Sequence, residues 1–223
     1  SMASQDVRYY LNGLLLEFDN NEIKGVATDG HRLALASSKL ENKEGLQLKQ
    51  ILPRKAVLEL SKLLPQSEEA VELNVGASYF SVKSGNLQLS TMLIDGKYHD
   101  YKKVFPSGDP SSLKIEKEKL QLALSRASVL SNEKYRGVRF ALSEGGLKLT
   151  ANNPEQESAE EVLDVDYTGV PLEIGFNIGY LLDALGSVET KYVELVFYGE
   201  DSSCIIKEPS SESEVYVIMP MRL

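Results

Sequence analysis

Cysteine and long apolar runs are scarce in this sequence, and each shortage excludes a class of protein. The single cysteine, Cys204, cannot form an internal disulfide, so nothing points to an oxidising compartment. No run of about 18 apolar residues occurs, which excludes a membrane-spanning helix. The opening residues SMASQDVRYY lack the charged-then-apolar pattern of a signal peptide. We therefore expect a cytoplasmic protein.

Basic charge is also short. The chain has 24 basic and 33 acidic residues, a net charge of −9. Residues 1–112 carry 13 basic and 14 acidic groups, a net of −1, whereas residues 113–223 carry 11 and 19, a net of −8. A protein that binds nucleic acid through affinity alone usually has a basic excess, so the bulk charge argues against such a binder.

Motifs for catalysis and for cofactor or metal binding are missing too. The sequence holds no HExxH, no paired CxxC, no GxxxxGK[ST] and no GxGxxG after a strand, so we expect no metal and no cofactor. The stretch most like an active site is VATDGHRLAL, residues 26–35, with Asp29, His31 and Arg32. One interpretation is a small hydrolase that uses His31 and Asp29. The other is a hairpin turn at Asp29-Gly30, which is favoured because His31 has no evident nucleophile or metal-ligand partner.

Alternation of apolar and polar residues dominates the rest of the chain. It is clear in GLLLEFD, IKGVATD, LNVGASYFSVKS, LQLSTMLID, VRFALSE, LKLTAN, VELVFYG and EVYVIMP. Turn residues separate these runs at Asp19-Asn20-Asn21, Asp29-Gly30, Gly85-Asn86, Glu144-Gly145-Gly146 and Gly199-Glu200-Asp201. Period-two runs joined by short turns predict antiparallel hairpins.

Three segments change to a helical period. Apolar residues fall on one face in residues 53–64, 118–131 and 177–187. Pro53 suits a first helical position, and Asn177 suits an N-cap. Strands interrupted by three helices predict an α+β protein.

Two similar halves flank a segment rich in proline, glycine and serine. That segment is KKVFPSGDPSS, residues 102–112, and we place the linker at 105–112, between domains 1–104 and 113–223. The segment that begins VRYYLNGLLLEFD resembles the one that begins GVRFALSEGGLKL at an offset of 131 residues, which aligns Arg8 with Arg139. The second half opens with a further strand and helix that the first half lacks. The repeat leaves open a further interpretation, a β-rich repeat protein that serves as an adhesion protein or a scaffold.

Three charged or apolar stretches each allow two interpretations. The acidic run PEQESAEEVLDVD is either a solvated strand or a surface for a basic partner. The basic residues near the first two helices are either solvated or weak phosphate contacts. The ending VYVIMPMRL is either a core edge strand or the wall of a groove, for which methionine is well suited.

Several of these motifs together resemble the β sliding clamp of bacterial replicative DNA polymerase. The resemblance rests on VRYYLNG, ATDGHRLA, LSNEKYRGVR, LTANNPEQE and VIMPMRL, and it runs from about Gln5 to Leu223. It implies the DNA-clamp fold, with repeated domains whose antiparallel sheets lie outside and whose helices line the inner face. Family members have three such domains, and two subunits close head-to-tail around duplex DNA. The chain resembles the last two domains, the first of them without its opening strand and helix.

The resemblance also implies functional surfaces. A ring holds DNA by topology, so weak phosphate contacts suffice. The residues expected to face DNA are Gln5, Arg8, Tyr9, Tyr10, Arg54, Lys55, Lys62, Arg126, Lys134 and Arg136. Polymerases, the clamp loader and repair proteins would insert a short apolar motif into a groove between the two domains. Its expected lining is Leu11, Gly13, Thr28, Gly30, His31, Arg32, Leu33, His99, Val104, Asn177, Tyr180, Ser203, Val217, Ile218, Met219, Pro220, Met221 and Arg222.

A ring interface is implied as well. Its expected residues are Val129, Leu130, Glu155, Glu157, Glu160 and Glu161. Their partners would lie on a first domain outside this chain, so we expect no closed ring from these residues alone. Two positions depart from the family pattern: His99 stands where proline is frequent, and Ser158 stands where an acid is common.

Overall fold

A computed structural model describes residues 1–19, 21–40, 47–64 and 70–223. The chain divides into two compact units, Ser1–Tyr101 and Lys102–Leu223, which we call unit 1 and unit 2. A short 3₁₀ helix, η2 (Tyr101–Val104), stands at the division, and strand β8 begins at Ser111. The segment expected as a linker therefore includes the first residues of β8.

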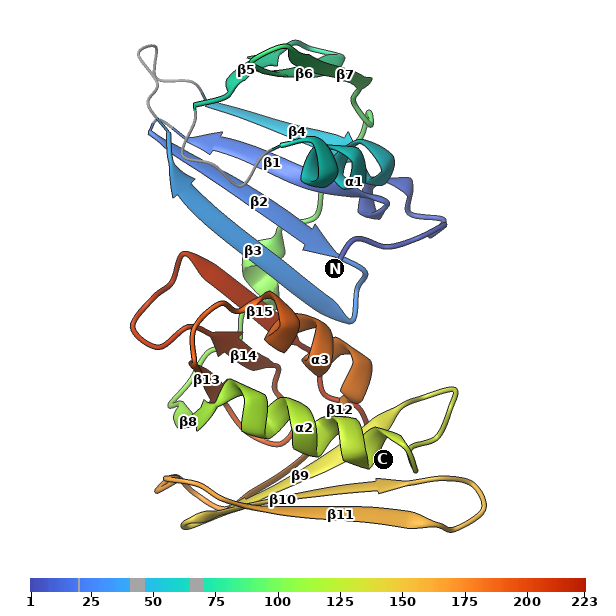
Figure 1. Cartoon of the computed structure of the whole chain (residues 1–223), viewed down its shortest axis with the longest axis vertical. Helices are drawn as coiled ribbons and strands as arrows, with labels where there is room; N and C mark the ends of the chain where they lie inside the picture. The colour runs from blue at the N-terminus through green and yellow to red at the C-terminus, as the bar shows by residue number, and fades with distance from the viewer. Residues whose placement is uncertain (20, 41–46, 65–69) are drawn as a thin grey trace. The chain divides into compact units, whose positions relative to one another are not determined.

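The described residues of unit 1 form two antiparallel sheets and one α-helix (Figure 1). The first sheet has the order β4-β1-β2-β3, with β1 (Gly13–Asp19), β2 (Glu22–Thr28), β3 (Arg32–Lys39) and β4 (Gln47–Pro53). The second has the order β5-β6-β7, with β5 (Glu72–Val75), β6 (Tyr79–Ser84) and β7 (Leu87–Met92). Helix α1 (Arg54–Leu63) packs on β1, β4 and β7.

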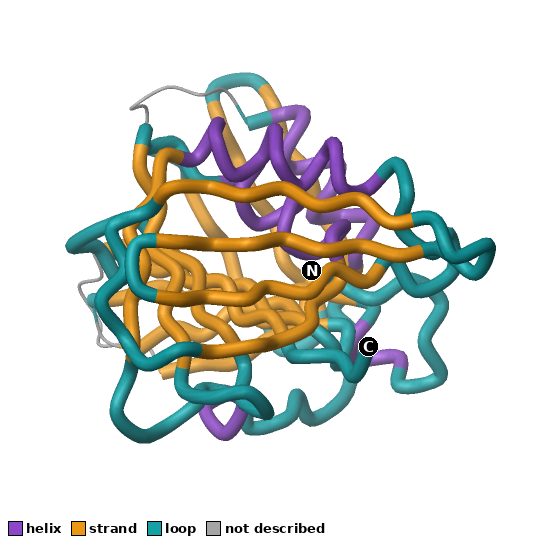
Figure 2. Tube along the Cα trace, turned by 90° about the horizontal axis from the view of Figure 1, so that it is seen from below, coloured by secondary structure: helices purple, strands orange, loops and turns teal. Residues whose placement is uncertain are grey.

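Unit 2 contains two four-stranded antiparallel sheets and two α-helices. One sheet has the order β11-β10-β9-β12, with β9 (Gly137–Ser143), β10 (Gly146–Asn152), β11 (Ser158–Asp164) and β12 (Leu172–Asn177). The other has the order β15-β14-β13-β8, with β8 (Ser111–Glu116), β13 (Tyr192–Phe197), β14 (Cys204–Lys207) and β15 (Glu214–Ile218). Helices α2 (Lys117–Ser128) and α3 (Ile178–Ser187) contact each other, and Figure 2 shows helices and strands by colour.

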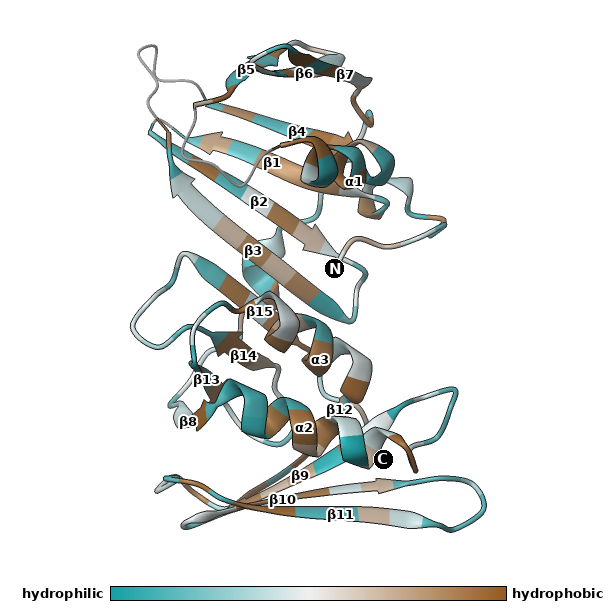
Figure 3. Ribbon diagram, viewed as in Figure 1, coloured by the Kyte–Doolittle hydropathy of each residue, from teal (hydrophilic) through white to brown (hydrophobic). Residues whose placement is uncertain are grey.

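The sequence periods explain these elements. The alternating runs form the strands, and β10 shows the simplest pattern: Leu147, Leu149 and Ala151 are buried while Lys148 is exposed. The three helical stripes form α1, α2 and α3, so the three predicted helices are confirmed. Figure 3 shows the same alternation as bands of unlike hydropathy along the ribbons. The α+β prediction is confirmed.

The internal repeat is confirmed at the level of elements, but its predicted offset is wrong. From β9 onward, unit 2 repeats the order of unit 1: four strands, a helix and three strands. The matching first strands begin at Gly13 and Gly137, which is an offset of 124 residues. The offset of 131 placed Arg8 in a strand, whereas Tyr9–Leu11 forms a 3₁₀ helix, η1. The tyrosines of η1 pack against other aromatic rings and do not take part in the hydrogen-bond ladder of a β-sheet.

Strand β8 and helix α2 have no counterpart among the described residues of unit 1. In unit 2, β8 pairs with β13, and α2 buries Leu120, Ala123, Leu124 and Ala127 completely. In unit 1, α1 buries only Ala56, and Leu58 and Leu63 remain 43% and 40% exposed. The helix of unit 1 therefore leaves large apolar side chains exposed.

Two further findings bear on the predicted class. Within the described residues, no helix is long and apolar enough to span a membrane. Cys204 is completely buried in β14, and burial raises the pKa of its thiol. A buried, protonated thiol is chemically unreactive.

Candidate functional site

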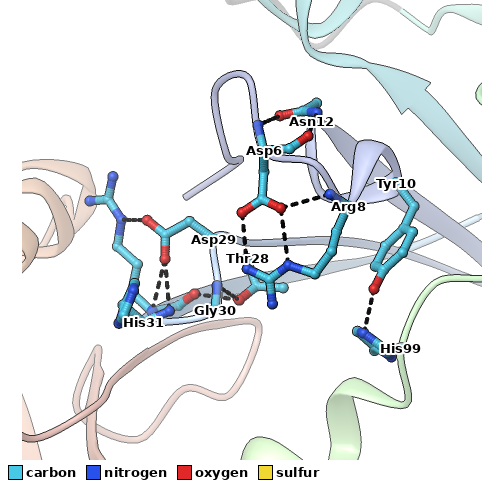
Figure 4. Close-up of polar contacts among 10 residues, drawn as sticks. Asp6, Arg8, Tyr10, Asn12, Thr28, Asp29, Gly30, His31 and His99 are labelled. Carbon is cyan, nitrogen blue, oxygen red and sulfur yellow. Dashed lines mark hydrogen bonds and ion pairs between the residues drawn. The ribbon is translucent and has the colours of Figure 1, made fainter.

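The turn between β2 and β3 carries the motif that looked most like an active site (Figure 4). Asp29 Oδ1 accepts hydrogen bonds from the backbone N–H groups of His31 and Arg32, at 2.9 and 3.1 Å. Asp29 Oδ2 binds Arg32 Nε at 3.0 Å. Thr28 Oγ1 donates to the Arg32 carbonyl and accepts from the Gly30 N–H. The predicted hairpin turn at Asp29-Gly30 is confirmed.

These contacts do not form the catalytic arrangement that a hydrolase would need. Both carboxylate oxygens of Asp29 stabilise the turn, so Asp29 does not orient the imidazole of His31. The His31 ring is exposed and forms no hydrogen bond with a described residue. In the described part of the chain, no group of three or more His, Cys, Asp or Glu side chains is arranged to hold a metal ion. The turn has a structural role, and it places Arg32 and His31 at the surface of unit 1.

The segment before β1 packs onto this turn. Asp6 and Arg8 form a two-point ion pair, with Nε–Oδ1 at 3.0 Å and Nη2–Oδ2 at 2.9 Å. The hydrogen bond from the Arg8 side chain lowers the pKa of Asp6 to about 2. The guanidinium of Arg8 lies next to Gly30, which has a φ of +92°. A side chain at position 30 would meet Arg8 and would also strain the backbone.

His99 forms a direct contact with the same segment. Its Nε2 lies 2.5 Å from Tyr10 Oη, and the two rings meet edge to face at 5.0 Å. Tyr98 lies beneath, 6.3 Å from the Tyr10 ring, and burial raises its pKa to about 12. The histidine thus ties η1 to the loop before η2, which a proline at position 99 could not do through a hydrogen bond.

The remaining groove residues of unit 1 differ in accessibility. Leu11, Gly13, Thr28 and Leu33 are buried, whereas Gly30 and Arg32 are half-buried and His31 and His99 are exposed. Gly13 is essential to the sheet, because a Cβ there would overlap the Leu52 carbonyl on β4. Of these expected groove residues, Gly30, His31, Arg32 and His99 are accessible to a ligand.

In unit 2 the expected groove residues lie at the start of α3 and around β15. Asn177 caps α3 as predicted: its Oδ1 accepts from the Tyr180 N–H at 3.2 Å, and its Nδ2 donates to the Tyr135 carbonyl. Val217 and Ile218 are fully buried in β15. The half-buried residues of the set are Val104, Asn177, Tyr180, Ser203, Met219, Pro220 and Met221, while Arg222 is exposed.

Most of the cations expected to face DNA already have partners within the chain. Arg54 donates to the Met2 carbonyl, Lys62 pairs with Glu59, and Arg126 pairs with Glu161 through two short hydrogen bonds. The side chains of Lys55 and Arg136 make no hydrogen bond or ion pair with a described residue, and the Lys134 ammonium lies over the Tyr135 ring. Gln5 and Tyr9 are exposed. Phosphate contact at the paired positions would compete with these internal contacts.

The residues expected at a ring interface surround β11. Val129 is 77% exposed and Leu130 is half-buried. Glu160 pairs with Lys148, Glu161 pairs with Arg126, and Glu157 accepts a hydrogen bond from Asn153. Glu155 is exposed and has no partner among the described residues.

Sequence reasoning missed Val162, which is 70% exposed on the edge strand β11. The alternation of SAEEVLD places Val162 among the residues that face outward, and this was the sequence signal from which its exposure could have been predicted.

Comparison with known protein families gives two matches that together cover the chain. Residues 1–100 match the central domain of the DNA polymerase III beta subunit, and residues 102–222 match its C-terminal domain. The chain belongs to the DNA polymerase III beta subunit family. The predicted resemblance to the β sliding clamp is confirmed.

Individual relatives agree with this family. The beta sliding clamp of Pseudomonas putida is 46% identical over 223 residues, and that of Escherichia coli K12 is 44% identical over 226. The chain spans 61% of the length of either relative, and all of the chain is covered. A crystal structure of the Pseudomonas aeruginosa sliding clamp with ligand superposes with a TM-score of 0.97 at 45% identity, covering the whole chain and 61% of that clamp. The Bacillus subtilis clamp gives 0.94 at 28% identity, covering the whole chain and 60% of that clamp.

Proposed function

We propose that the chain acts as part of a DNA sliding clamp, the non-catalytic processivity subunit of a bacterial replicative DNA polymerase, in the cytoplasm. The observation that carries the proposal is that both units match the beta subunit family in order and almost without a gap. A clamp encircles double-stranded DNA, so it needs no overall basic charge. This explains how a chain with a net charge of −9 can work on DNA.

The second part of the proposal is a peptide-binding groove for polymerases, repair proteins and the clamp loader. It would draw on Arg32 and His31 from unit 1 and on Met219 from unit 2. A solved Pseudomonas aeruginosa clamp is described as bound to griselimycin, which supports a ligand site on this family. A guest leucine or phenylalanine that is fully buried would gain roughly 1.5–3 kcal/mol. The stem of Arg32 can cover such a side chain while its guanidinium keeps its bond to Asp29.

The test is binding of a fluorescent peptide of the form Gln-Leu-x-Leu-Phe, measured by anisotropy. We expect micromolar binding that is lost in Arg32→Ala and in Met219→Ala. A peptide with both leucines and the phenylalanine replaced by alanine should not bind. Lys83→Ala, an exposed change on β6, should bind like the unchanged protein. Equal binding by all four proteins would remove the groove from the proposal.

The third part concerns the ring. We infer that Val129, Leu130 and the acids of β11 face a neighbouring subunit in the assembled clamp. For the 223 residues by themselves, light scattering after size-exclusion chromatography should give a monomer mass. A stable dimer that persists after Val129→Glu would show that these residues do not form the contact surface.

A further inference from the structure

The hydroxyl of Tyr98 is buried and has no hydrogen-bond partner among the described residues. The residue lies in the loop before η2 and is only 9% exposed. Native proteins pair the large majority of their buried side-chain polar atoms, so an unpaired one calls for an explanation. In the described part of the chain, Tyr98 Oη is the single buried side-chain oxygen or nitrogen in this condition.

The unpaired function of Tyr98 is its hydroxyl proton. Burial raises the pKa of Tyr98 to about 12, so the side chain is protonated at neutral pH. The backbone of Thr28 acts in the opposite direction and lowers this pKa, which identifies the nearby group as a donor, the Thr28 N–H. This N–H approaches the oxygen outside hydrogen-bond geometry and provides no acceptor for the proton.

Tyr98 lies between two parts of unit 1 that are expected to line the peptide groove. Thr28 is the last residue of β2, directly before the turn that carries His31 and Arg32. On the other side, His99 follows Tyr98 in the chain and is exposed. The unpaired donor is therefore adjacent to the accessible residues of this surface.

Two side chains cover Tyr98. The Tyr10 ring meets the Tyr98 ring edge to face at 6.3 Å, and Tyr10 Oη is bonded to His99 Nε2 at 2.5 Å (Figure 4). Tyr10 is half-buried and His99 is exposed, so this pair lies toward the solvent from Tyr98. We call Tyr10 and His99 the ring cover. Its side-chain hydrogen bond joins segments 89 residues apart, so rotation of either side chain can open it.

We propose that Tyr98 determines specificity in the peptide groove by donating its hydroxyl to a carbonyl oxygen of the guest peptide when the ring cover opens. This inference rests on the groove proposed above and adds a polar contact to its apolar ones. The acceptor is a neutral carbonyl, because the negative charge of Asp29 already acts on Tyr98 and contributes to its raised pKa. A guest carboxylate at this point would be repelled.

Tyr98→Phe gives a result that a purely structural hydroxyl would not give. The change keeps the ring and removes the unpaired donor, so unit 1 should become more stable against hydrogen exchange. The same change should weaken binding of the Gln-Leu-x-Leu-Phe peptide about three- to tenfold, the range for one hydrogen bond. A hydroxyl with a partner inside the folded chain would give the reverse, a loss of stability with unchanged binding, and that result overturns the proposal.

Tyr10→Phe tests the ring cover. It keeps the ring but removes the bond to His99, so the open state costs less and the peptide should bind about two- to threefold more tightly. This gain should disappear when Tyr98→Phe is added, because an open cover then exposes no donor. Tyr79→Phe is the matched control on β6, where the residue is 45% exposed, and it should leave binding unchanged. A gain that persists in the double variant contradicts the role of Tyr98.

A second peptide identifies which carbonyl is the acceptor. Norleucine in place of the glutamine keeps the length of the side chain and removes its carbonyl. If Tyr98→Phe has no effect on binding of this peptide, the acceptor is the glutamine side chain. If the effect persists, the acceptor is a backbone carbonyl of the guest.

Direct observation of the hydroxyl separates this inference from the groove itself. In unchanged chain labelled with ¹³Cζ-tyrosine, peptide should shift the signal of Tyr98 and leave that of Tyr79 in place. Binding that is lost in Arg32→Ala but is equal in Tyr98→Phe, with no shift of the Tyr98 signal, keeps the groove and overturns the inference. If the folded, unchanged chain does not bind the peptide, the groove and the inference both fail.

Discussion

Units 1 and 2 share an element order, yet they bury their helices to very different degrees. Helix α3 of unit 2 buries Ile178, Leu181, Ala184 and Leu185, and it contacts a second helix, α2. Helix α1 of unit 1 has no such neighbour among the described residues and buries only Ala56. The difference shows that a repeated strand order is sufficient to form the sheets, whereas completion of the core depends on the additional strand and helix, β8 and α2.

The largest effect should come from removing a leucine from the completed core. Leu124→Ala in α2 removes a fully buried side chain and should cost unit 2 about 3–4 kcal/mol of unfolding free energy. Leu60→Ala on the half-buried face of α1 should cost unit 1 about 1–2 kcal/mol, since much less contact is lost. Hydrogen exchange followed by mass spectrometry can measure each unit separately. Equal losses in the two units would contradict the comparison.

A smaller loss should follow in unit 1 when the buried contact between Tyr101 and the Glu17 carboxylate is removed. Tyr101 Oη donates to Glu17 at 2.9 Å, and Lys49 holds the other oxygen of Glu17. Tyr101→Phe should cost unit 1 about 1.5–3 kcal/mol, the range for hydrogen bonds to charged groups. Unit 2 should be unaffected, and a loss of similar size there would show that the units are coupled.

The same tyrosine gives unit 1 a dependence on alkaline pH. Burial, followed by the hydrogen bond to Glu17, raises the pKa of Tyr101 above its ordinary value of 10. The corresponding stability is therefore fully present below pH 10 and is lost as the pH rises further. Tyr101→Phe should reduce the slope of the stability profile of unit 1 above pH 10 without removing it, because burial also raises the pKa of Tyr98. Unit 2 should keep its slope, because burial raises the pKa of its Tyr216 to about 12.

The two helices that follow the four-stranded sheets also differ in their caps. Asn177 caps α3, whereas Pro53 precedes α1 without a side-chain cap. Asn177→Ala should destabilise unit 2 by about 1 kcal/mol. Asn177→Asp keeps the accepting oxygen and loses only the donor to Tyr135, so it should cost less. Denaturant titration of the three proteins would show whether the cap or the donor matters more.

The smallest effects concern one exposed ion pair in each unit. Arg8 lowers the pKa of Asp6 to about 2, and the hydrogen bonds from Arg126 lower the pKa of Glu161. Arg8→Ala should return the pKa of Asp6 toward 3.8, and Arg126→Ala should return that of Glu161 toward 4.5. Each lowered pKa stabilises its unit above the ordinary carboxyl pKa, and this contribution is lost as pH falls through the lowered value. NMR titration of the two carboxyl groups would detect the change, and an unchanged pKa in either variant would show that the pair does not persist in solution.

Local patterns predicted the strands, the three helices and the turn at Asp29 because these depend on residues close in sequence. The family assignment likewise came from short motifs such as ATDGHRLA. The features that the patterns missed depend on contacts between distant segments. VRYY has strand-like composition, but Tyr10 turns into η1 to meet His99, 89 residues away. Arg126 looked available on a polar helix face, but β11 brings Glu161 to it.

Burial of the thiol in β14 has a practical consequence for labelling. Cys204 is the single cysteine of the chain and is completely enclosed, so maleimide reagents should leave the folded protein unmodified. A cysteine introduced at an exposed position such as Lys83 would then react selectively, without any change to Cys204. One fluorophore could be attached at a chosen point of either unit, so that its emission reports on that unit with the native sequence otherwise intact.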